Sequence, residues 1–368
     1  MKIIILKNNL KAGLDAVGRS VGSNTNLPVL NTVLISAERN QIKLSATNLE
    51  LAVTKTVFGK IIEDGGLAVP YPIFSSVVNN IATERVSLES KGGALTIKTD
   101  NYEASIQGID KKEFPIIPPV EDRSERVEVE GSVLKEALSK TIVAAEVSDL
   151  RPEISGVLFL VELSELKVVA TDSFRLAEAT ISGKQIKSTF KKGARVTIPL
   201  KAAQELTRAV EEKEGVRLSF NDTQALFESE SLELITRVIE GKFPDYQAII
   251  PKEAETEVSV GREDLISGLK LAGAFSGRNS EVQLKVKDKK VLEISASDSS
   301  VGRNRYTIPV KVSGPDAEIT FNWQYLLDGI KNESSKGVVL RLNGEERPTL
   351  IKSSDGSSYF YILMPIRP

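Results

Sequence analysis

The chain of 368 residues contains no cysteine and no histidine. Their absence excludes disulfide bonds, zinc sites built from these two residue types, thiol nucleophiles and every catalytic triad that uses imidazole as its base. Carboxylates and lysines alone can still support catalysis, so the composition leaves an enzyme open but favours a binding protein. We expect no metal site and no cofactor.

Long hydrophobic runs are also lacking, because no apolar stretch approaches the roughly 20 residues that cross a bilayer. The apolar run at residues 3–6 is too short for the core of a signal peptide, and no cleavage-like site follows it. We predict that this run is an opening β-strand and that the protein is cytoplasmic.

Neither sign of charge dominates, since 48 Lys and Arg residues against 50 Asp and Glu residues leave a net charge of −2. With 41% hydrophobic and 27% charged residues, the chain has the composition of an ordinary globular protein of two or three domains. Any contact with nucleic acid must therefore come from local basic patches and not from the overall charge.

The most informative feature that is present is a threefold internal repeat. Residues 42–48, 166–172 and 292–298 have similar sequences and follow one another at a spacing of about 125 residues. This period is too long for a small solenoid repeat, because each copy is large enough to hold its own hydrophobic core. The sequence therefore predicts three similar domains in a row.

The joints between the copies are marked by proline and charge. Phe114-Pro115 and Phe243-Pro244 occupy matching positions, and a charged run follows each of them. A proline-rich stretch followed by charges is typical of a linker. The predicted domains are residues 1–120, 127–250 and 254–368.

Each copy shows the same order of elements. An amphipathic helix comes early, as in the first copy, where Leu10, Leu14, Val17 and Val21 form one stripe. A second helix follows a strand, with Asn322 as a suitable N-cap in the third copy, and short loops between the strands favour antiparallel pairing. The sequence thus predicts an α+β fold, with three tandem repeats of a domain made of two helices and an antiparallel sheet. The predicted helices are residues 7–21, 71–83, 131–146, 199–211, 262–278 and 322–336.

Three features leave their role open. The helices at residues 7–21 and 262–278 carry a small positive excess, which suits contact with phosphate backbones, although charge alone favours ordinary solvated helix faces. Only the second copy places Phe and Arg after the repeated Thr-Asp turn, at Thr171–Arg175, either by chance in a hairpin turn or as a special surface. The apolar C-terminus at 359–368 is either a buried strand or the wall of a binding groove.

Acidic pairs are the remaining catalytic candidates. Asp172 and Asp298 occupy equivalent turns of different copies, so we expect them to lie farther apart than the roughly 5–10 Å that paired-carboxylate chemistry needs. Lys91-Gly92-Gly93 lacks the residues of a phosphate-binding loop and is typical of a turn. The residues alone point to no active site.

From end to end, the chain resembles the bacterial sliding clamp family, the beta subunit of DNA polymerase III holoenzyme. The resemblance rests on the threefold repeat and on motifs at residues 27–31, 170–177, 241–246 and 363–367. It implies a non-catalytic processivity factor: a head-to-tail dimer of three-domain protomers that closes into a six-domain ring around duplex DNA, with the helices lining the hole. It also implies that the replicative polymerase, the clamp loader and repair proteins bind through short, partly hydrophobic peptide motifs.

The resemblance further implies a set of site residues. A peptide-motif pocket between the second and third domains is expected to include Ile154, Thr171, Ser173, Phe174, Arg175, Leu176, Pro244, Ile249, Asn322, Tyr325, Ile362, Leu363, Met364, Pro365, Ile366 and Arg367. Contact with DNA is expected from Lys11, Arg19, Asn24, Lys140, Arg151, Lys201, Arg208 and Lys331. The dimer contact is expected to include Ala104 and Ile106 on one side, and Ala274 and Phe275 on the other.

Three positions depart from the family pattern. Ser173-Phe174 stands where relatives often have glycine followed by histidine or another ring. The loop at residues 23–26 has no charge where some relatives carry arginine. The turn at residues 148–153 keeps Arg151 but lacks the aromatic residues that relatives can offer to DNA. We expect the fine shape of the pocket and the DNA contacts of this chain to differ accordingly.

Two other classes of protein stand as alternatives. A carboxylate-dependent hydrolase on a repeated α/β scaffold requires two acids that converge in one cleft. An adhesion or scaffold protein predicts export and no preference for DNA. The lack of histidine and cysteine, the missing signal peptide and the resemblance all favour the DNA-encircling clamp.

Overall fold

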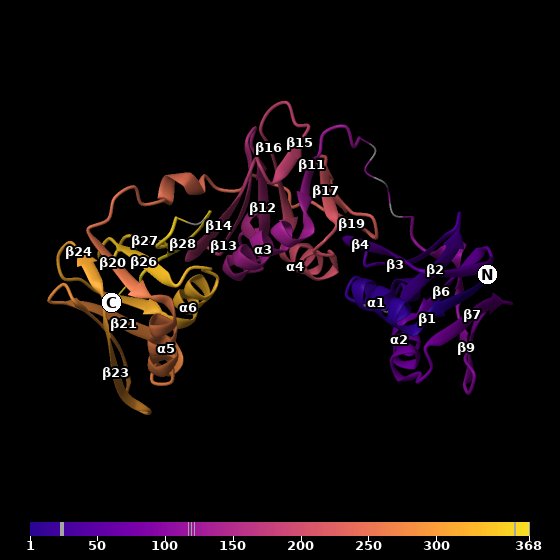
Figure 1. Ribbon diagram of the computed structural model, residues 1–368, viewed down its shortest axis with the longest axis horizontal. Coiled ribbons are helices and arrows are strands. Elements are labelled where there is room, and N and C mark those ends of the chain that lie inside the picture. The colour runs from indigo at the N-terminus through magenta and orange to yellow at the C-terminus, as the bar shows by residue number, and fades with distance from the viewer. Residues whose placement is uncertain (23–25, 117, 119, 121, 357, 368) are drawn as a thin grey trace. The chain divides into compact units, whose positions relative to one another are not determined.

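The computed structural model describes residues 1–22, 26–116, 118, 120, 122–356 and 358–367. Antiparallel sheets dominate the fold, and a few short helices lie against them (Figure 1). The α-helices of the described ranges are α1 (Lys7–Val17), α2 (Tyr71–Asn80), α3 (Gly131–Thr141), α4 (Leu200–Ala209), α5 (Arg262–Gly273) and α6 (Trp323–Lys331). No helix within these ranges is long and apolar enough to span a membrane.

Every predicted helix is present, but each ends earlier than its prediction. The clearest case is α1, which stops at Val17 and leaves Val21 outside the helix. The reason is local, because the Ser20 hydroxyl donates a hydrogen bond to the Val17 carbonyl at 2.7 Å and satisfies a group that the next turn would have used. In α5 the Ser276 hydroxyl caps the Gly273 carbonyl in the same way at 2.9 Å.

The chain divides into two compact units, which are residues 1–135, 187–191 and 204–238 on the one hand and residues 136–186, 192–203 and 239–368 on the other. The first unit contains a five-stranded sheet in the order β5 (Gly59–Glu63), β1 (Lys2–Leu6), β7 (Arg85–Lys91), β8 (Ala94–Lys98) and β9 (Glu103–Gln107). It also contains a ten-stranded sheet in the order β10 (Ile109–Asp110), β6 (Gly65–Pro70), β2 (Thr32–Glu38), β3 (Gln41–Thr47), β4 (Leu51–Val57), β19 (Leu232–Arg237), β18 (Gln224–Glu228), β17 (Gly215–Phe220), β11 (Val127–Glu130) and β15 (Ile186–Ser188).

The second unit has a similar pair of sheets. The larger one has nine strands in the order β16 (Ala194–Pro199), β12 (Gly156–Val161), β13 (Glu165–Thr171), β14 (Arg175–Ser182), β28 (Tyr359–Leu363), β27 (Thr349–Ser353), β26 (Gly337–Leu342), β20 (Thr256–Gly261) and β24 (Lys311–Ser313). The smaller one has four strands in the order β23 (Gly302–Pro309), β22 (Val291–Asp298), β21 (Glu281–Lys287) and β25 (Glu318–Asn322).

The division into units passes through the central copy of the repeat because two large sheets run on across the joints between copies. In the first unit β19 of the central copy pairs with β4 of the first copy, with Ile235 opposite Ala52. In the second unit β14 of the central copy pairs with β28 of the third copy, with Leu176 opposite Ile362. Strands of the central copy therefore belong to the sheets of both neighbours, which the repeat pattern in the sequence does not reveal.

Helices α1 and α5 come early in their copies, each directly after one strand, and lie very close to the strands beneath them. Leu10 and Leu14 of α1 are buried against β3 and β4, and Gly13 lies between them. A Cβ atom at Gly13 would lie 2.6 Å from Val57 Cγ1 and 2.7 Å from Leu44 Cδ1, so a larger residue at this position requires these two side chains to move. Gly268 of α5 is in the same situation, because its Cβ would lie 2.7 Å from Ile294 Cδ1.

We predict that Gly13→Val lowers the free energy of unfolding by about 1–3 kcal/mol, because the added side chain must displace Val57 and Leu44 in a packed core. The measurement is urea unfolding followed by circular dichroism. Gly193→Ala is the control, since its Cβ would make an ordinary contact of 3.6 Å with the Val161 carbonyl. An unchanged urea midpoint in Gly13→Val would show that α1 does not pack as described.

Candidate functional site

The turn at Thr171–Arg175 is held by hydrogen bonds to two side chains. Thr171 Oγ1 accepts from the Ser173 N–H at 3.2 Å and donates to the Arg175 carbonyl at 2.7 Å. Asp172 Oδ1 accepts from the N–H groups of Phe174 and Arg175, both at 2.9 Å. Ser173 takes φ of 79°, which is the left-handed region. The repeated Thr-Asp sequence thus forms a tight connection between β13 and β14.

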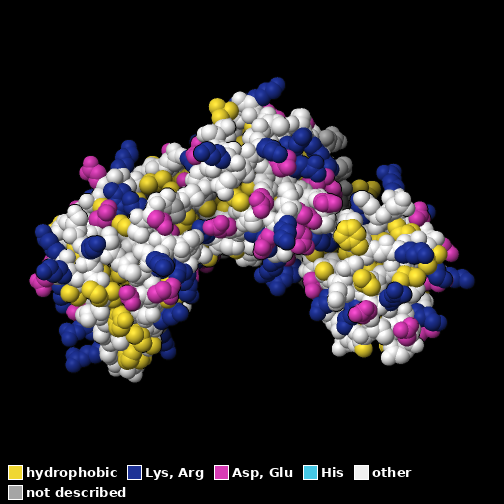
Figure 2. All heavy atoms as spheres, in the orientation of Figure 1, with side chains coloured by type: hydrophobic (Ala, Val, Ile, Leu, Met, Phe, Trp, Pro, Cys, Tyr) yellow, Lys and Arg dark blue, Asp and Glu magenta, His cyan; other side chains and the backbone are white. Residues whose placement is uncertain are grey.

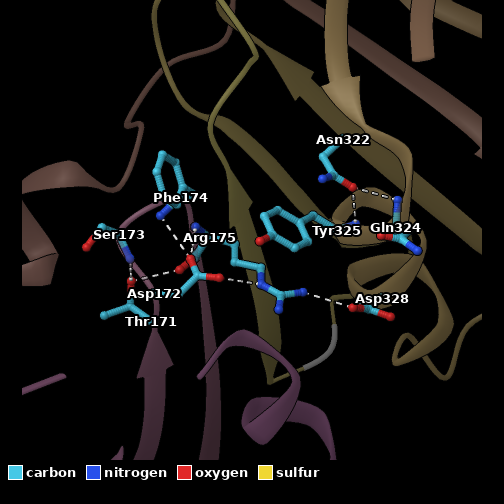
Figure 3. Close-up of polar contacts among 9 residues, drawn as sticks. All are labelled: Thr171, Asp172, Ser173, Phe174, Arg175, Asn322, Gln324, Tyr325 and Asp328. Atoms are coloured by element: carbon cyan, nitrogen blue, oxygen red, sulfur yellow. Dashed lines mark hydrogen bonds and ion pairs between the residues drawn. The ribbon is translucent and has the colours of Figure 1, made fainter. Parts of the chain in front are cut away.

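The Arg175 side chain links this turn to α6. Its Nε donates to Asp172 Oδ2 at 2.7 Å, and its Nη1 donates to Asp328 Oδ2 at 2.8 Å (Figure 3). The guanidinium lies over the Tyr325 ring at 3.9 Å from the ring centroid, a distance at which cation–π attraction is strong. Two carboxylates and one ring therefore fix the arginine, whose side chain is mostly buried.

The first turn of α6 is set by Asn322. Its side-chain oxygen accepts from the Gln324 N–H at 2.9 Å and from the Tyr325 N–H at 3.3 Å, as a helix N-cap does. This confirms the N-cap expected at Asn322. Because the cap fixes where α6 starts, it also fixes where Tyr325 and Asp328 lie relative to Arg175.

Apolar side chains surround the turn. Phe174 points away from the polar network, and 62% of its surface is exposed (Figure 3). Ile249, near the end of the central copy, is a further exposed aliphatic side chain. Large apolar side chains that are exposed to water next to a buried apolar cluster are typical of a protein contact surface. The buried cluster beneath comprises Ile154, Leu158, Val169, Leu176, Phe243, Tyr246, Leu350 and Ile362.

The C-terminal residues run along the same region. Tyr359–Leu363 is a buried strand, which confirms one of the two expectations for the apolar terminus. The Met364 N–H donates to the Phe174 carbonyl at 2.8 Å, and the Ile366 N–H donates to the Thr320 carbonyl at 2.9 Å. These two bonds pin the tail between the turn and β25, and they leave residues 364–366 half-buried.

The residues predicted for the peptide-motif pocket fall into two groups. The buried ones form the support, and they are Ile154, Thr171, Leu176, Ile362 and Leu363. The ones that are exposed or only partly buried are Ser173, Phe174, Arg175, Pro244, Ile249, Asn322, Tyr325, Met364, Pro365, Ile366 and Arg367. We call the second group the Phe174 surface.

Sequence reasoning missed the two carboxylates that hold Arg175. The sequence indicates Asp172 as part of a turn and as one of two acidic catalytic candidates but not as a partner of Arg175, although its place two residues after a repeated alanine is a usable signal. Asp328 gives no signal, because it lies 153 positions from Arg175 in the sequence. Arg151, predicted as a DNA contact, donates to Ser173 Oγ at 2.9 Å and so lies beside the turn.

The residues predicted to contact DNA differ in their surroundings. Lys140 is mostly buried, because it donates to Glu136 Oε1 at 2.7 Å and to Ser334 Oγ at 3.0 Å and lies 5.7 Å from the Tyr359 ring centroid. Its charge is therefore already engaged within the protein. Asn24 lies outside the described residues. The exposed members of the set are Lys11, Arg19, Arg151, Lys201, Arg208 and Lys331.

Arg19 and Arg208 line one hollow of about 400 Å³ in the first unit. Acidic groups share this hollow, since Glu205 Oε1 accepts from Arg208 Nη1 at 3.0 Å and Glu211 Oε1 accepts from Lys55 Nζ at 3.1 Å. Lys and Arg side chains are likewise interspersed with Asp and Glu over the face seen in Figure 2. The basic character is local and partly neutralised.

The residues predicted for the dimer contact lie at or near sheet edges. Ala104 and Ile106 are on β9, the last strand of the five-stranded sheet. Ala274 caps α5 and Phe275 follows it, in the same copy as β23, the last strand of the four-stranded sheet. Ala274 is exposed, Ala104 and Phe275 are half-buried, and Ile106 is buried.

Sequence profiles of one family match the chain in three consecutive parts. The profile of the DNA polymerase III beta subunit, N-terminal domain, matches residues 1–118. The central-domain profile of the same subunit matches residues 128–245, and the C-terminal-domain profile matches residues 247–367.

Individual relatives and solved structures agree over the full length. The chain is 26% identical over 380 residues to the beta sliding clamp of Bacillus subtilis (strain 168), with 100% of both chains covered. The crystal structure of the DNA polymerase III beta subunit from Thermotoga maritima matches with a TM-score of 0.91 and 25% identity, covering 100% of this chain and 99% of that one. A DnaN sliding clamp from Bartonella birtlesii bound to griselimycin matches with a TM-score of 0.92 and 27% identity, covering 100% of both. The chain belongs to the DNA polymerase III beta-subunit family, the family of the bacterial sliding clamps.

Proposed function

We propose that this protein is a DNA sliding clamp, which encircles duplex DNA and tethers the replicative polymerase and other clamp-binding proteins during replication in the cytoplasm. It is a processivity factor and has no catalytic activity of its own. The observation that carries this function is the match of the three beta-subunit domain profiles, in order, along nearly the whole chain.

The ring is proposed to form from two copies joined head to tail. The first domain (1–120) of one copy meets the third domain (254–368) of the other, and the central domain is residues 127–250. In support, β9 and β23 are edge strands, whose outer sides pair with no other strand in the part of the chain that the structure describes, and such edges pair readily with another chain. A head-to-tail contact forms a closed ring when the rotation that relates one copy to the next returns to the first copy.

Weak contact with DNA is proposed to be sufficient. A closed ring is held on DNA by its topology, so its contacts with phosphate need neither high affinity nor sequence readout. The partly neutralised hollow around Arg19 and Arg208 fits this requirement, because strong phosphate binding would slow sliding. The proposed set of DNA contacts is completed by Lys11, Asn24, Lys140, Arg151, Lys201 and Lys331.

The Phe174 surface, with the buried residues that support it, is proposed to bind the peptide motifs of partner proteins. The exposed Phe174 and Ile249 supply apolar contact, while Arg175 and Asn322 supply fixed polar groups. A mostly apolar surface with a few placed polar groups suits capture of a short peptide. Two carboxylates already fix the Arg175 side chain before a peptide binds, so peptide binding costs little side-chain entropy at this residue.

We predict that the protein, loaded by a matched clamp loader and ATP, stays on circular duplex DNA at high salt and leaves when the circle is cut. The physical reason is that a topological link has no salt dependence, whereas phosphate contacts weaken steeply with salt. The measurement is gel filtration of labelled protein with circular and linearised DNA. If retention is the same on circular and linearised DNA and falls only as salt rises, the result would contradict the proposed ring.

We predict that the triple variant Lys11→Glu, Arg19→Glu and Arg208→Glu loads less efficiently and binds nonspecific DNA more weakly. Each phosphate contact that the variant removes lowers the salt slope of binding by about one. The control reverses the charge of three other exposed lysines, which gives the same change in net charge: Lys60, Lys184 and Lys191. Equal loading and equal salt slopes in the two triple variants would remove the three tested residues from the proposed lining.

We predict that Phe174→Ala weakens binding of a labelled peptide carrying a polymerase clamp-binding motif by about tenfold, because the substitution removes an exposed aromatic side chain from the docking surface. Fluorescence anisotropy measures the affinity. Phe58→Ala is the matched control, since Phe58 is another strongly exposed phenylalanine. If both variants bind the peptide as the unchanged protein does, Phe174 is not part of the docking surface.

A further inference from the structure

The first copy of the repeat contains a turn with the same hydrogen-bond frame as Thr171–Arg175. In this turn, Thr47–Leu51, Thr47 Oγ1 accepts from the Leu49 N–H at 3.0 Å and donates to the Leu51 carbonyl at 3.1 Å. Asn48 Oδ1 accepts from the N–H groups of Glu50 at 3.0 Å and Leu51 at 2.8 Å. Leu49 takes φ of 76°, close to the 79° of Ser173. The two turns therefore correspond bond by bond.

The backbone beside the two turns corresponds as well. The Arg237 N–H donates to the Glu50 carbonyl at 2.9 Å, just as the Met364 N–H donates to the Phe174 carbonyl at 2.8 Å. In each case the donor lies at the C-terminal end of the strand that pairs with the strand after the turn. The end of β19 therefore lies beside the first turn in the same way as the start of the C-terminal tail lies beside the second.

The apolar support beneath the first turn is smaller but placed in the same way. Ile235 lies opposite Ala52 and Leu226, as Ile362 lies opposite Leu176 and Leu350 in the second unit. The repeat has thus produced a second turn on a second apolar base. The separate buried cluster at this base consists of Val120, Leu226 and Ile235.

A pocket of about 280 Å³ opens at the first turn. Its base is apolar and buried, and it is formed by Leu51, Ala52 and Ile235. Two large aliphatic side chains on its walls face water, since Leu49 is 52% exposed and Ile116 is 91% exposed. Other lining residues are Thr47, Glu50, Pro115, Pro118, Gln224 and Arg237.

The charges of this pocket differ from those of the Phe174 surface. Leu51 stands where the second copy has Arg175, so no cation lies at the base. The charges stand on the lining instead, where Glu50 and Arg237 are exposed and have no ion pair among the described residues. An occupant must therefore be apolar at its centre and carry one basic and one acidic group, to complement Glu50 and Arg237.

We propose that this pocket docks a second short peptide segment of partner proteins, which inserts one aliphatic or aromatic side chain between Leu49 and Ile116. A basic residue of the segment faces Glu50, and an acidic residue faces Arg237. A volume of about 280 Å³ is at the small end of ligand sites, so it accepts one anchoring side chain and not a long motif. The inference rests on the proposed function, because it takes the Phe174 surface to be a peptide-docking surface.

The experiment uses the full chain and two labelled probes. The first is the acetylated and amidated peptide Lys-Leu-Phe-Asp, and the second is a peptide carrying the polymerase clamp-binding motif. Leu49→Asn removes the apolar wall and suits the positive φ, because asparagine tolerates this region better than leucine does, so the variant should fold. Ile116→Asp is the second variant, and Leu163→Asn is the control, since Leu163 is 77% exposed elsewhere.

The expected result is that Leu49→Asn and Ile116→Asp each weaken binding of Lys-Leu-Phe-Asp by about tenfold and leave the motif peptide unaffected. Phe174→Ala should weaken binding of the motif peptide and leave binding of Lys-Leu-Phe-Asp unaffected. Leu163→Asn should change neither affinity. Glu50→Lys should shift preference from Lys-Leu-Phe-Asp towards Asp-Leu-Phe-Asp, because the charge that selects the basic residue has been reversed.

Other outcomes overturn the proposal. If Lys-Leu-Phe-Asp does not bind, or if Phe174→Ala abolishes its binding while Leu49→Asn preserves it, the pocket is not a docking site. If Leu49→Asn instead abolishes self-association in sedimentation, the occupant of the pocket is a second copy of the chain. In each case the proposed function stands if Phe174→Ala weakens binding of the motif peptide. If Phe174→Ala leaves that binding unchanged, the result counts against the proposed function as well.

Discussion

The buried carboxylate of Asp172 is the interaction on which the Phe174 surface depends. Its side chain is 1% exposed, and it accepts hydrogen bonds from two backbone N–H groups of the turn and from the Arg175 guanidinium. A buried charge is tolerated only when it is paired and hydrogen-bonded, so the turn and the arginine each require the other. The same carboxylate thereby sets the position of Arg175 over the Tyr325 ring and against Asp328.

Local patterns in the sequence predicted the fold well. The repeated segments, the helix stripes and the N-cap at Asn322 depend on residues close in sequence, and the structure contains them, except that α1 ends before Val21. What the sequence did not reveal depends on distant partners. Asp328 meets Arg175 across 153 positions, and Lys140 meets Ser334 across 194. Likewise, nothing local in β4 or β19 indicates that these strands pair across a joint between copies.

The residues proposed to contact DNA illustrate why charge alone is a poor guide. Lys140, Arg208 and Lys331 all lie in the last turn of a helix, where a positive charge is favourable because of the helix dipole. These side chains therefore have a reason to be basic that has nothing to do with a ligand. Lys140 goes further, since its ion pair with Glu136 and its contact with the Tyr359 ring use its charge within the fold.

The frame shared by the two turns has an evolutionary consequence. Every hydrogen bond of the frame is made by the backbone or by the first two side chains, which are threonine followed by asparagine or aspartate. The third and fourth side chains, Leu49-Glu50 in one copy and Ser173-Phe174 in the other, take no part in it. A duplicated domain therefore inherits an intact scaffold with a fourth position that is free to mutate and a third that must only tolerate a positive φ, which is 76° at Leu49 and 79° at Ser173. New binding specificities can arise there by drift, while selection on stability keeps the turn itself unchanged.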